Sequence, residues 1–446
     1  MEKVLIANRG EIAVRIVRAC RELGLATVAA HSTADEHGLP VLLADESVCI
    51  GPPRARDSYL NVDAIVQAAK QVGADAIHPG YGFLAESPAF AHACHAAGIT
   101  FVGPSADVIE RMGDKAAARA VARDAGVPVV PGIDGIASVE DALAAADEIG
   151  FPVMIKAAAG GGGRGIRVAT RADELAVLVD EAAREAEAAF GDGRLYLERM
   201  LVGARHVEVQ VLGDGRGNAI HVFERECTLQ RRRQKILEES PSPALTPETR
   251  QALCASAAQL ACSVSYAGAG TLEYLLDATG AFFFIEMNTR IQVEHPVTEL
   301  VTGLDLVKEQ LRIAAGAPLS VTQEQVRQTG HAIEFRINAE DPTRGFLPSP
   351  GTIAELRLPG GPGVRIDTAI YAGYTIPPFY DSLVAKLLVW GVDREEAIAR
   401  GKRALRELHV EGIKTTAALH LELLDDPAVR AGAVDVEWLE RRLEER

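Results

Sequence analysis

The chain has 446 residues, which at roughly 150 residues per domain corresponds to about three domains, each able to bury its own core. Hydrophobic residues make up 48% and charged residues 24%, as in soluble globular proteins, so disordered and collagen-like classes are excluded. The 62 acidic residues outnumber the 46 basic ones, and a net charge of −16 has the wrong sign for binding nucleic acid through its phosphates.

The sequence shows no sign of a membrane or secreted protein. No apolar run approaches the roughly 18 residues of a membrane helix, and charged residues interrupt the start, where a signal peptide would be apolar. We therefore expect a cytoplasmic protein. The six cysteines are dispersed without a Cys-x-x-Cys pair, which favours isolated core thiols over disulfides or structural zinc.

The first hundred residues alternate short β-type runs with helical patterns, which predicts a parallel α/β sheet. Asn8 and Glu11 stand three residues apart and predict a capping box for the first helix, and Gly24 predicts its end. Charged residues line one face of this helix, where we expect solvent or a dimer partner: Glu11, Arg15, Arg18 and Glu22.

The middle of the chain contains a second helical pattern at residues 113–126, which a Pro-rich linker at residues 127–132 follows. The next segment, residues 131–203, is rich in Ala and Glu. We expect it to form a small inserted lid that can move.

A strand at residues 153–156 runs into the glycine run 160–165. Consecutive glycines let backbone N–H groups approach a phosphate, and Lys156 and Arg164 add positive charge. The alternative is a flexible hairpin tip, and a Walker A sequence is absent.

A hairpin is predicted around residues 277–280, with a loop of two or four residues. Glu273 would then lie directly opposite Glu286, with the two Cβ atoms about 5 Å apart. Two carboxylates so placed repel each other unless a cation lies between them, which indicates a Mg²⁺ site for a nucleotide. Asn288 and Arg290 continue the alternation of Glu286.

After Gly316 the composition changes to strands with Pro-Gly turns and a closing helix at residues 394–408. The predicted domains are residues 1–113, residues 114–316 with the lid at about 131–203, and residues 317–446.

Several motifs then place the chain in a family. They are GEIAVRI near the start, HPGYGFLAE (78–86), MGDK (112–115), GGGGRG, QRRRQK (230–235), EMNTRIQVEHPVTE (286–299) and RINAEDP (336–342). In this order they resemble biotin carboxylase of the ATP-grasp family over essentially the whole chain. The resemblance implies a Rossmann-like N-terminal domain, an ATP-grasp fold with a mobile lid, and a mixed α+β C-terminal domain.

The resemblance also implies the roles of individual residues toward ATP and its metal. The nucleotide would contact Lys115, Lys156, Gly161, Gly162, Gly163, Glu198, the Arg199 and Leu201 backbone and His206. The metal, Mg²⁺ or Mn²⁺, would bind Glu273, Glu286 and Asn288.

The other implied roles concern bicarbonate and biotin. Arg290, whose planar fork suits a small planar anion, would hold bicarbonate with Gln292 and the Val293 backbone. Glu294 would be the base that deprotonates it, and Lys235 would contact phosphate or bicarbonate.

On the biotin side, Arg336 would stabilise the enolate, and Tyr81, Gly82 and Gln230 would line the pocket. Strand alternation places Arg336 on one face with Glu334 and Asn338, and Ile333, Phe335 and Ile337 toward the core. A structural ion pair of Arg336 with Glu334 or Glu340 is the alternative.

Two positions depart from the family pattern. Ala159 stands where the glycine loop usually has one more glycine, which should stiffen the loop. Arg233 stands where the family has His, within three successive arginines, and is not counted among the site residues.

The expected activity is ATP- and bicarbonate-dependent carboxylation of biotin through carboxyphosphate, as the first half-reaction of an acyl-CoA carboxylase, acetyl-CoA foremost. No lysine is flanked by methionines on both sides, so the biotinyl carrier is expected to be a separate chain, as is the carboxyltransferase. The resemblance also implies a homodimer. The alternatives are another ATP-grasp ligase, which leaves Arg290, Gln292 and Glu294 unexplained, and a nucleotide-binding regulatory protein without catalysis.

Overall fold

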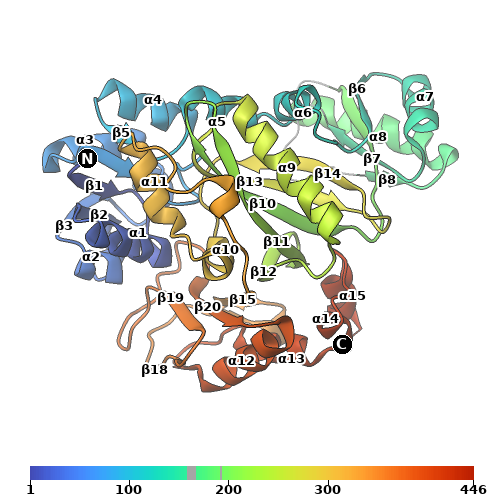
Figure 1. Ribbon diagram of the computed structural model, residues 1–446. Helices are drawn as coiled ribbons and strands as arrows, with labels where there is room; N and C mark the ends of the chain where they lie inside the picture. Colours follow the sequence, from blue (N-terminus) through green and yellow to red (C-terminus); the bar gives the residue numbers. More distant parts are fainter. Residues whose placement is uncertain (158–166, 191–192, 446) are drawn as a thin grey trace. The chain divides into compact units, whose positions relative to one another are not determined.

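The computed structural model describes residues 1–157, 167–190 and 193–445 (Figure 1). The chain divides into two compact units. The main unit contains Met1–Val127, Arg205–Tyr274 and Glu286–Arg446. The inserted unit contains Pro128–Ala204 and Leu275–Ile285, and the bounds of the predicted lid, residues 131–203, fall within it.

The N-terminal part of the main unit is a parallel sheet of five strands in the order β3-β2-β1-β4-β5, as predicted. Its strands are β1 (Lys3–Ile6), β2 (Ala26–Ser32), β3 (Glu46–Gly51), β4 (Ala76–His78) and β5 (Thr100–Phe101). Its helices are α1 (Gly10–Glu22), α2 (Leu39–Leu43), α3 (Val62–Val72), α4 (Pro88–Ala96) and α5 (Ala106–Gly113). Helix α6 (Lys115–Asp124) follows, and the Asp114 side chain caps it by accepting from the N–H of Ala117.

Helix α1 differs from its prediction in two respects. Arg9 is its N-cap, and among the described residues no side chain caps its first turn. Asn8 instead donates to the carbonyls of Pro79 and Tyr81, at 2.7 and 2.8 Å, because a loop of the sheet packs over it. The charged face is also not uniformly solvated, since Glu11 and Arg15 are buried by the rest of the main unit.

A second sheet has eight strands in the order β14-β13-β10-β11-β12-β15-β20-β19. Their bounds are β10 (Arg205–Asp214), β11 (Ala219–Arg231), β12 (Gln234–Ser240), β13 (Ala267–Leu276), β14 (Phe282–Asn288), β15 (His331–Asn338), β19 (Val364–Thr368) and β20 (Leu383–Gly391). The pairs from β10 to β19 that have a resolved register are antiparallel. Helices α9 (Pro247–Ser263), α10 (His295–Thr302) and α11 (Leu306–Ala314) belong to this part of the chain.

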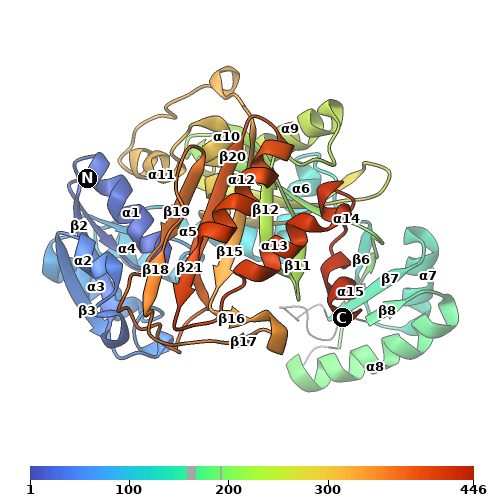
Figure 2. The same cartoon turned by 90° about the horizontal axis from the view of Figure 1, so that it is seen from below.

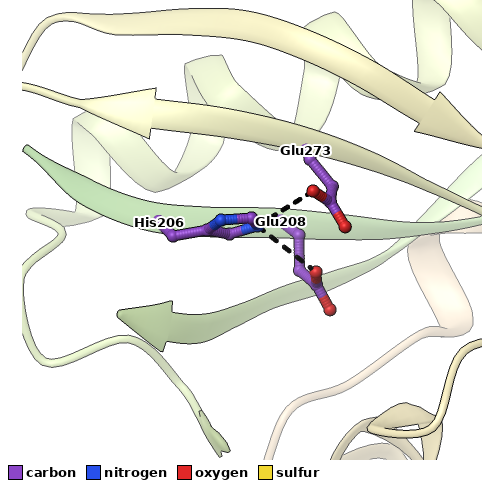
Figure 3. Close-up of side chains that lie close together, drawn as sticks. All are labelled: His206, Glu208 and Glu273. Carbon is purple, nitrogen blue, oxygen red and sulfur yellow. Dashed lines mark ion pairs between the residues drawn. The ribbon is translucent and has the colours of Figure 1, made fainter. Parts of the chain in front are cut away.

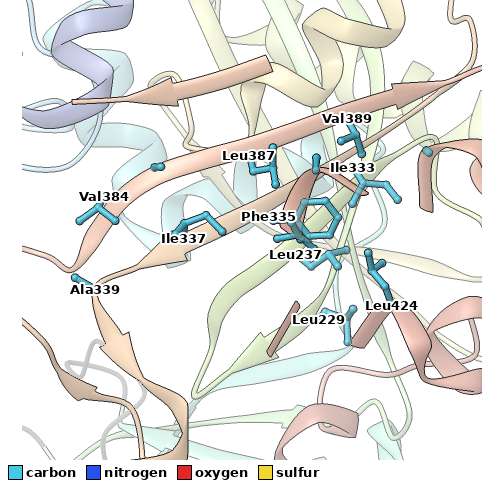
Figure 4. Close-up of a cluster of buried hydrophobic side chains, with 14 of the residues drawn as sticks. Leu229, Leu237, Ile333, Phe335, Ile337, Ala339, Val384, Leu387, Val389 and Leu424 are labelled. Atoms are coloured by element: carbon cyan, nitrogen blue, oxygen red, sulfur yellow. The ribbon is translucent and has the colours of Figure 1, made fainter. Parts of the chain in front are cut away.

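One face of β15 and β20 forms the C-terminal core. Ile333, Phe335 and Ile337 pack there with Leu387 and Val389, as strand alternation predicted (Figure 4). Arg336 and its neighbours on the opposite face therefore point away from this core. Helix α12 packs against β15 and β20 (Figure 2).

Helix α12 (Arg394–Glu407) matches the predicted closing helix, but the chain does not close there. After it come β21 (His409–Glu411) and helices α13 (Ala417–Asp425), α14 (Pro427–Arg430) and α15 (Trp438–Glu444). The remaining short strands are β16 (Glu340–Asp341), β17 (Leu347–Pro348) and β18 (Glu355–Arg357). Within the described residues no helix is long and apolar enough to cross a membrane.

The inserted unit contains a four-stranded sheet in the order β6-β9-β7-β8. Its elements are β6 (Gly132–Ile136), α7 (Val139–Ile149), β7 (Val153–Ala157), β8 (Arg167–Ala169), α8 (Ala172–Phe190) and β9 (Leu195–Arg199). The core between the sheet and the two helices is rich in alanine, with Ala142, Ala145 and Ala182 buried beside Leu175 and Leu197.

The turn between β13 and β14 has three residues rather than two or four. The N–H of Asp277 donates to the carbonyl of Ala281 at 2.9 Å, so the paired positions near the turn are offset by one from the prediction. Gly280 takes the left-handed conformation, with φ of +86°, that a three-residue hairpin loop requires. The even-numbered loop that was assumed for this hairpin is therefore wrong at the turn, and the direct opposition of Glu273 and Glu286 stays a prediction.

Candidate active site

Lys235, at the start of β12, lies at the centre of a buried cluster of charged side chains. Its Nζ donates to Glu208 at 2.5 Å, to Glu294 at 2.6 Å and to Glu273 at 3.0 Å. The three carboxylates come from β10, from the residue before α10 and from β13. We call these four residues the Lys235 cluster. It brings together three residues that the sequence assigned separately, Lys235, Glu273 and Glu294.

The cluster keeps its carboxylates ionised. Burial raises the pKa of Glu294, but the Lys235, Arg336 and Arg225 cations together outweigh burial and lower the pKa. Lys235 and Arg225 together hold the pKa of Glu208 well below its usual range. The same carboxylates raise the pKa of Lys235 despite its burial. At neutral pH Glu294 is therefore an anion that can accept a proton.

His206 lies beside Glu273 and Glu208, with Nε2 3.2 Å and 3.7 Å from their carboxylate oxygens (Figure 3). Burial disfavours the imidazolium, but the Glu273 carboxylate raises the pKa of His206 to about 9. The ligand atoms of the three residues lie within 4.8 Å of one another. Only Glu273 of this group was predicted as a metal ligand.

The predicted metal ligands are only partly together. Glu273 Oε1 accepts from the Asn288 amide at 2.9 Å, so these two residues are in contact. Glu286 pairs instead with Lys115 at 3.0 Å, near the start of α6. Carboxylate oxygens and an asparagine carbonyl are the ligands that suit Mg²⁺, so the donor set fits this ion.

The 289–294 segment, between β14 and α10, carries the residues assigned to bicarbonate. The Arg290 guanidinium donates to Glu86 at 2.8 Å and to Asn288 Oδ1 at 2.9 Å. The Gln292 side chain accepts from Arg225 at 2.7 Å and donates to Glu273 Oε1 at 2.9 Å. Bonds from three different strands thus position this segment beside the Lys235 cluster.

Arg336 contacts one carboxylate oxygen of Glu294 while Lys235 contacts the other. Its Nη2 donates to Glu294 Oε2 at 3.0 Å, and its Nε donates to Glu238 at 2.5 Å. The alternative ion pairs with Glu334 or Glu340 are therefore not the contacts that the structure shows. Glu294 bridges the two cations, and this links the predicted base to the residue predicted to stabilise the biotin enolate.

A second pair of buried carboxyl groups lies behind Arg336. Glu238 on β12 and Glu334 on β15 are directly opposite each other, and both are fully buried. Burial raises the pKa of Glu238 to about 7 and that of Glu334 well above its usual range. Neither Glu334 oxygen has a hydrogen-bond partner among the described residues. Burial therefore disfavours the ionised form of Glu334, and this group keeps its proton to a higher pH than an exposed glutamate does.

Replacing Glu334 with glutamine is expected to make the protein more stable, relative to wild type, as the pH rises. Above the unfolded pKa of 4.5, the unfolded wild type gains an ionised Glu334 that the folded state cannot accept, so wild-type stability falls. Glutamine does not ionise, so the variant has no such loss. Its free energy of unfolding minus that of the wild type should rise by up to about 1.4 kcal/mol per pH unit. Urea unfolding between about pH 5 and pH 8 measures this. Glu36→Gln, at an exposed position, is the control, and parallel curves for Glu334→Gln and wild type would show that Glu334 is ionised.

The residues predicted for the biotin side lie in two places. Gln230 donates to His206 Nδ1 at 3.0 Å and to the Cys227 carbonyl at 2.8 Å, beside the Lys235 cluster. Tyr81 and Gly82 line a cavity of about 130 Å³. The Tyr81 hydroxyl donates to Glu11 on α1.

The other residues assigned to the nucleotide belong to the inserted unit or fall outside the described part. Lys156 on β7 forms an ion pair with Glu198 on β9. Glu198 is diagonal to Lys156, because the residue directly opposite Lys156 is Tyr196. The Arg199 N–H donates to the Pro131 carbonyl at 2.9 Å, and Leu201 is half-buried. Gly161, Gly162 and Gly163 lie outside the described residues. Their roles toward ATP stay predictions.

Five charged residues at or beside the site were missed from the sequence: Glu11, Glu208, Arg225, Glu238 and Lys386. All five are buried. In β10, Glu208 alternates with apolar residues, a pattern that is typical of a solvent-facing side, and in β12 Glu238 stands beside a second glutamate, Glu239. Here both faces of the sheet are covered, so the polar face is internal. The sequence signal that could have revealed these residues was the number of glutamates on neighbouring strands. That number is larger than an ordinary solvent-facing surface would explain.

Comparisons with known proteins show the family to which the chain is similar. Three family models match the chain. They are the N-terminal domain of biotin carboxylase (residues 1–109), the ATP binding domain of the carbamoyl-phosphate synthase L chain (114–322) and the C-terminal domain of biotin carboxylase (334–441).

The chain is 56% identical over 445 residues to a biotin carboxylase of Pseudomonas aeruginosa, with 99% of each chain covered. It is 50% identical to one of the pyruvate carboxylase subunits of Methanothermobacter thermautotrophicus, covering 98% of this chain and 89% of that protein. A solved structure with a TM-score of 0.91 and 50% identity covers 99% of this chain and 97% of the other. It is the biotin carboxylase domain dimer of Hydrogenobacter thermophilus 2-oxoglutarate carboxylase with MgADP, ADP and bicarbonate.

The fold and the matched domains define an ATP-dependent ligase of the ATP-grasp class, with a Rossmann-like N-terminal sheet and a mixed α+β C-terminal part. The chain belongs to the biotin carboxylase family. The predicted family and fold class are thereby confirmed.

Proposed function

We propose that this protein carboxylates biotin on a separate carrier chain, using ATP and bicarbonate, as the first half-reaction of an acyl-CoA carboxylase, acetyl-CoA foremost. The observation that carries the proposal is Glu294, a buried carboxylate in contact with both Lys235 and Arg336. This arrangement joins a base for bicarbonate to a cation that can stabilise the biotin enolate. Relatives include pyruvate and 2-oxoglutarate carboxylases, so the acyl acceptor is the part to be tested separately.

In the proposed reaction, the Arg290 guanidinium, the Gln292 amide and the Val293 backbone hold bicarbonate beside Glu294. Glu294 takes the bicarbonate proton, and the resulting dianion attacks the γ-phosphorus of ATP to give carboxyphosphate and ADP. Lys115, Lys156 and glycines 161–163 orient the phosphates. Positioning and charge stabilisation supply most of the rate in phosphoryl transfer, and this site offers both.

Glu273, Glu286 and Asn288 would hold Mg²⁺, and the ion would neutralise charge on the ATP phosphates. Carboxyphosphate then decomposes to CO₂ and phosphate, and the phosphate removes the N1′ proton of biotin. Arg336 stabilises the negative charge on the ureido oxygen while N1′ attacks CO₂. Tyr81, Gly82 and Gln230 line the biotin side.

We also propose that the chain is a homodimer with a separate carboxyltransferase. The Hydrogenobacter thermophilus relative crystallised as a dimer, which supports the first part. The division into residues 1–113, 114–316 and 317–446 is likewise a proposal, and the three matched family models support it.

One assay tests the proposed activity against its alternatives. ATP cleavage is measured with and without bicarbonate and free biotin. A biotin carboxylase requires bicarbonate and forms carboxybiotin, whereas a different ligase requires its own amine and a regulatory protein shows neither activity. Adding biotinylated carrier protein with carboxyltransferase, and comparing acetyl-CoA with pyruvate and 2-oxoglutarate, tests the acceptor.

Glu273→Gln and Glu286→Gln are each expected to raise the Mg²⁺ concentration that gives half-maximal turnover, because each removes one anionic ligand. Neither should unfold the protein, since Lys235 keeps two other carboxylates and Lys115 is mostly exposed. Metal titration of bicarbonate-dependent ATP cleavage is the measurement, with Glu36→Gln as the control. An unchanged Mg²⁺ requirement in both variants would refute the assigned ligands.

A further inference from the structure

Lys386 is a fully buried lysine outside the residues assigned so far. It lies on β20, directly opposite Arg336 on β15. Its Nζ donates to the Val293 carbonyl at 2.8 Å and lies 3.1 Å from Glu11 on α1. Asp367 on β19 is farther away, at 3.9 Å. The ammonium group therefore joins three separate elements at one point.

The Val293 carbonyl belongs to the peptide bond that joins Val293 to Glu294. Glu294 is the N-cap of α10, so the orientation of this peptide sets the direction in which the proposed base leaves the backbone. The preceding carbonyl, of Gln292, is also held, by His295 Nδ1 at 2.7 Å. Two successive carbonyls are thus anchored by buried side chains. Lys386 anchors the one nearer the base.

On its other side, Lys386 is connected to the cavity that Tyr81 lines. Glu11 Oε1 is the acceptor for the Tyr81 hydroxyl and the atom nearest to Lys386. Glu11 Oε2 has no hydrogen-bond partner among the described residues. One carboxylate oxygen therefore carries both contacts, and a continuous chain runs from Tyr81 through Glu11 and Lys386 to Val293.

The charge on Lys386 is maintained by its surroundings. Burial lowers the pKa of the ammonium, but Glu11 on α1 and Asp367 on β19 raise it above its usual value, and Glu334 on β15 adds to this only where it is ionised. Arg365, also on β19, opposes them. A lysine that stays protonated keeps donating to the Val293 carbonyl over the working pH range.

We propose that Lys386 is a positioning residue that sets the Val293–Glu294 peptide and, through Glu11, couples it to Tyr81. Changes at the Tyr81 contact then alter bicarbonate-dependent ATP cleavage even when biotin is absent. The inference rests on the proposed function. The competing explanation is that Lys386 only balances the buried charges of Glu11 and Asp367, and this predicts lower stability with unchanged bicarbonate kinetics.

The test measures bicarbonate-dependent ATP cleavage without biotin, together with the melting temperature of each variant. Lys386→Met keeps the length of the side chain and removes its charge and hydrogen bonds. It is expected to lower kcat/KM for bicarbonate about tenfold or more, because small displacements of a catalytic group have large effects on rate. KM for ATP should change less than about twofold, since the nucleotide residues are elsewhere. Lys402→Met, which removes an ion pair with Asp425 at the surface, is the matched control.

Tyr81→Phe distinguishes coupling from local effects. If Tyr81 contacts biotin only, this variant behaves as wild type when biotin is absent. The coupling predicts a several-fold loss without biotin, and a Tyr81→Phe/Lys386→Met double variant no worse than Lys386→Met alone. If Lys386→Met does not fold, Glu11→Gln and its double variant with Tyr81→Phe carry the same comparison.

Wild-type bicarbonate kinetics in Lys386→Met, or in Tyr81→Phe without biotin, would overturn the inference. If the losses of Tyr81→Phe and Lys386→Met add in the double variant, the proposed coupling between Tyr81 and Lys386 would be overturned. A wild-type protein that shows no bicarbonate-dependent ATP cleavage would refute the proposed function instead, so the two failures are distinct.

Discussion

Glu294→Gln is expected to lose both bicarbonate-dependent ATP cleavage and biotin carboxylation, by about 10²-fold or more, the usual scale for a general base. The Glu294 carboxylate is buried and ionised, because Lys235, Arg336 and Arg225 together lower its pKa against the effect of burial. Glutamine keeps the size and can still accept from Lys235, but it cannot take a proton. Since every later step needs deprotonated bicarbonate, both activities should fall together. Phosphate release and carboxybiotin formation are measured in parallel.

The control for this variant must also remove a buried carboxylate. Glu309→Gln serves, because Glu309 is buried on α11 and paired with Arg312, away from the Lys235 cluster. Glu309→Gln should retain wild-type rates. If Glu294→Gln keeps bicarbonate-dependent ATP cleavage at the wild-type level, another group is the base.

Arg336→Ala is expected to retain appreciable bicarbonate-dependent ATP cleavage while carboxybiotin formation falls, at a cost of about 3 kcal/mol if it resembles the loss of one oxyanion donor. Lys235 remains beside Glu294 in this variant, so the base keeps one cation at 2.6 Å. Glu238 loses its guanidinium partner, and its pKa, already about 7, should rise further. Protonation of Glu238 would limit the loss of stability that an unpaired buried charge causes.

Measuring the melting temperature beside the two activities separates a catalytic from a structural role. Arg394→Ala is a suitable reference, because Arg394 pairs with the buried Glu239 in the same part of the chain. Equal loss of both activities in an unstable Arg336→Ala protein, with Arg394→Ala similarly unstable, would mean that Arg336 is a structural ion-pair partner.

The structure shows which features could be predicted from the sequence. Strand alternation placed Arg336 opposite the Phe335 core, and the helical pattern starting at residues 113–115 is α6, because both follow from local periodicity. The Asn8 capping box was wrong, since Asn8 has tertiary partners that a local pattern cannot reveal. The burial of Glu11 has the same cause: its partner Lys386 is on β20, near the other end of the chain.

The candidate site likewise contains some features that local sequence predicts and others that depend on tertiary contacts. Residue types for a base, an anion clamp and metal ligands could be named from motifs, but their partners could not. That Arg336 contacts Glu238 and Glu294 depends on how β12, β15 and the 289–294 segment meet in space. The predicted turn of the β13–β14 hairpin was wrong for a smaller reason, because the loop has three residues where an even number was assumed.

The burial of α1 has a consequence for how the chain acquires its structure during synthesis. Arg15 pairs with Glu299 at 3.0 Å and with Asp305 at 2.5 Å, across sequence separations of 284 and 290 residues. Loop-closure entropy makes such distant contacts late events in folding. An N-terminal fragment emerging from the ribosome therefore presents Glu11 and Arg15 to water without their partners. The predicted domain boundary near residue 113 therefore does not imply that residues 1–113 become stable on their own.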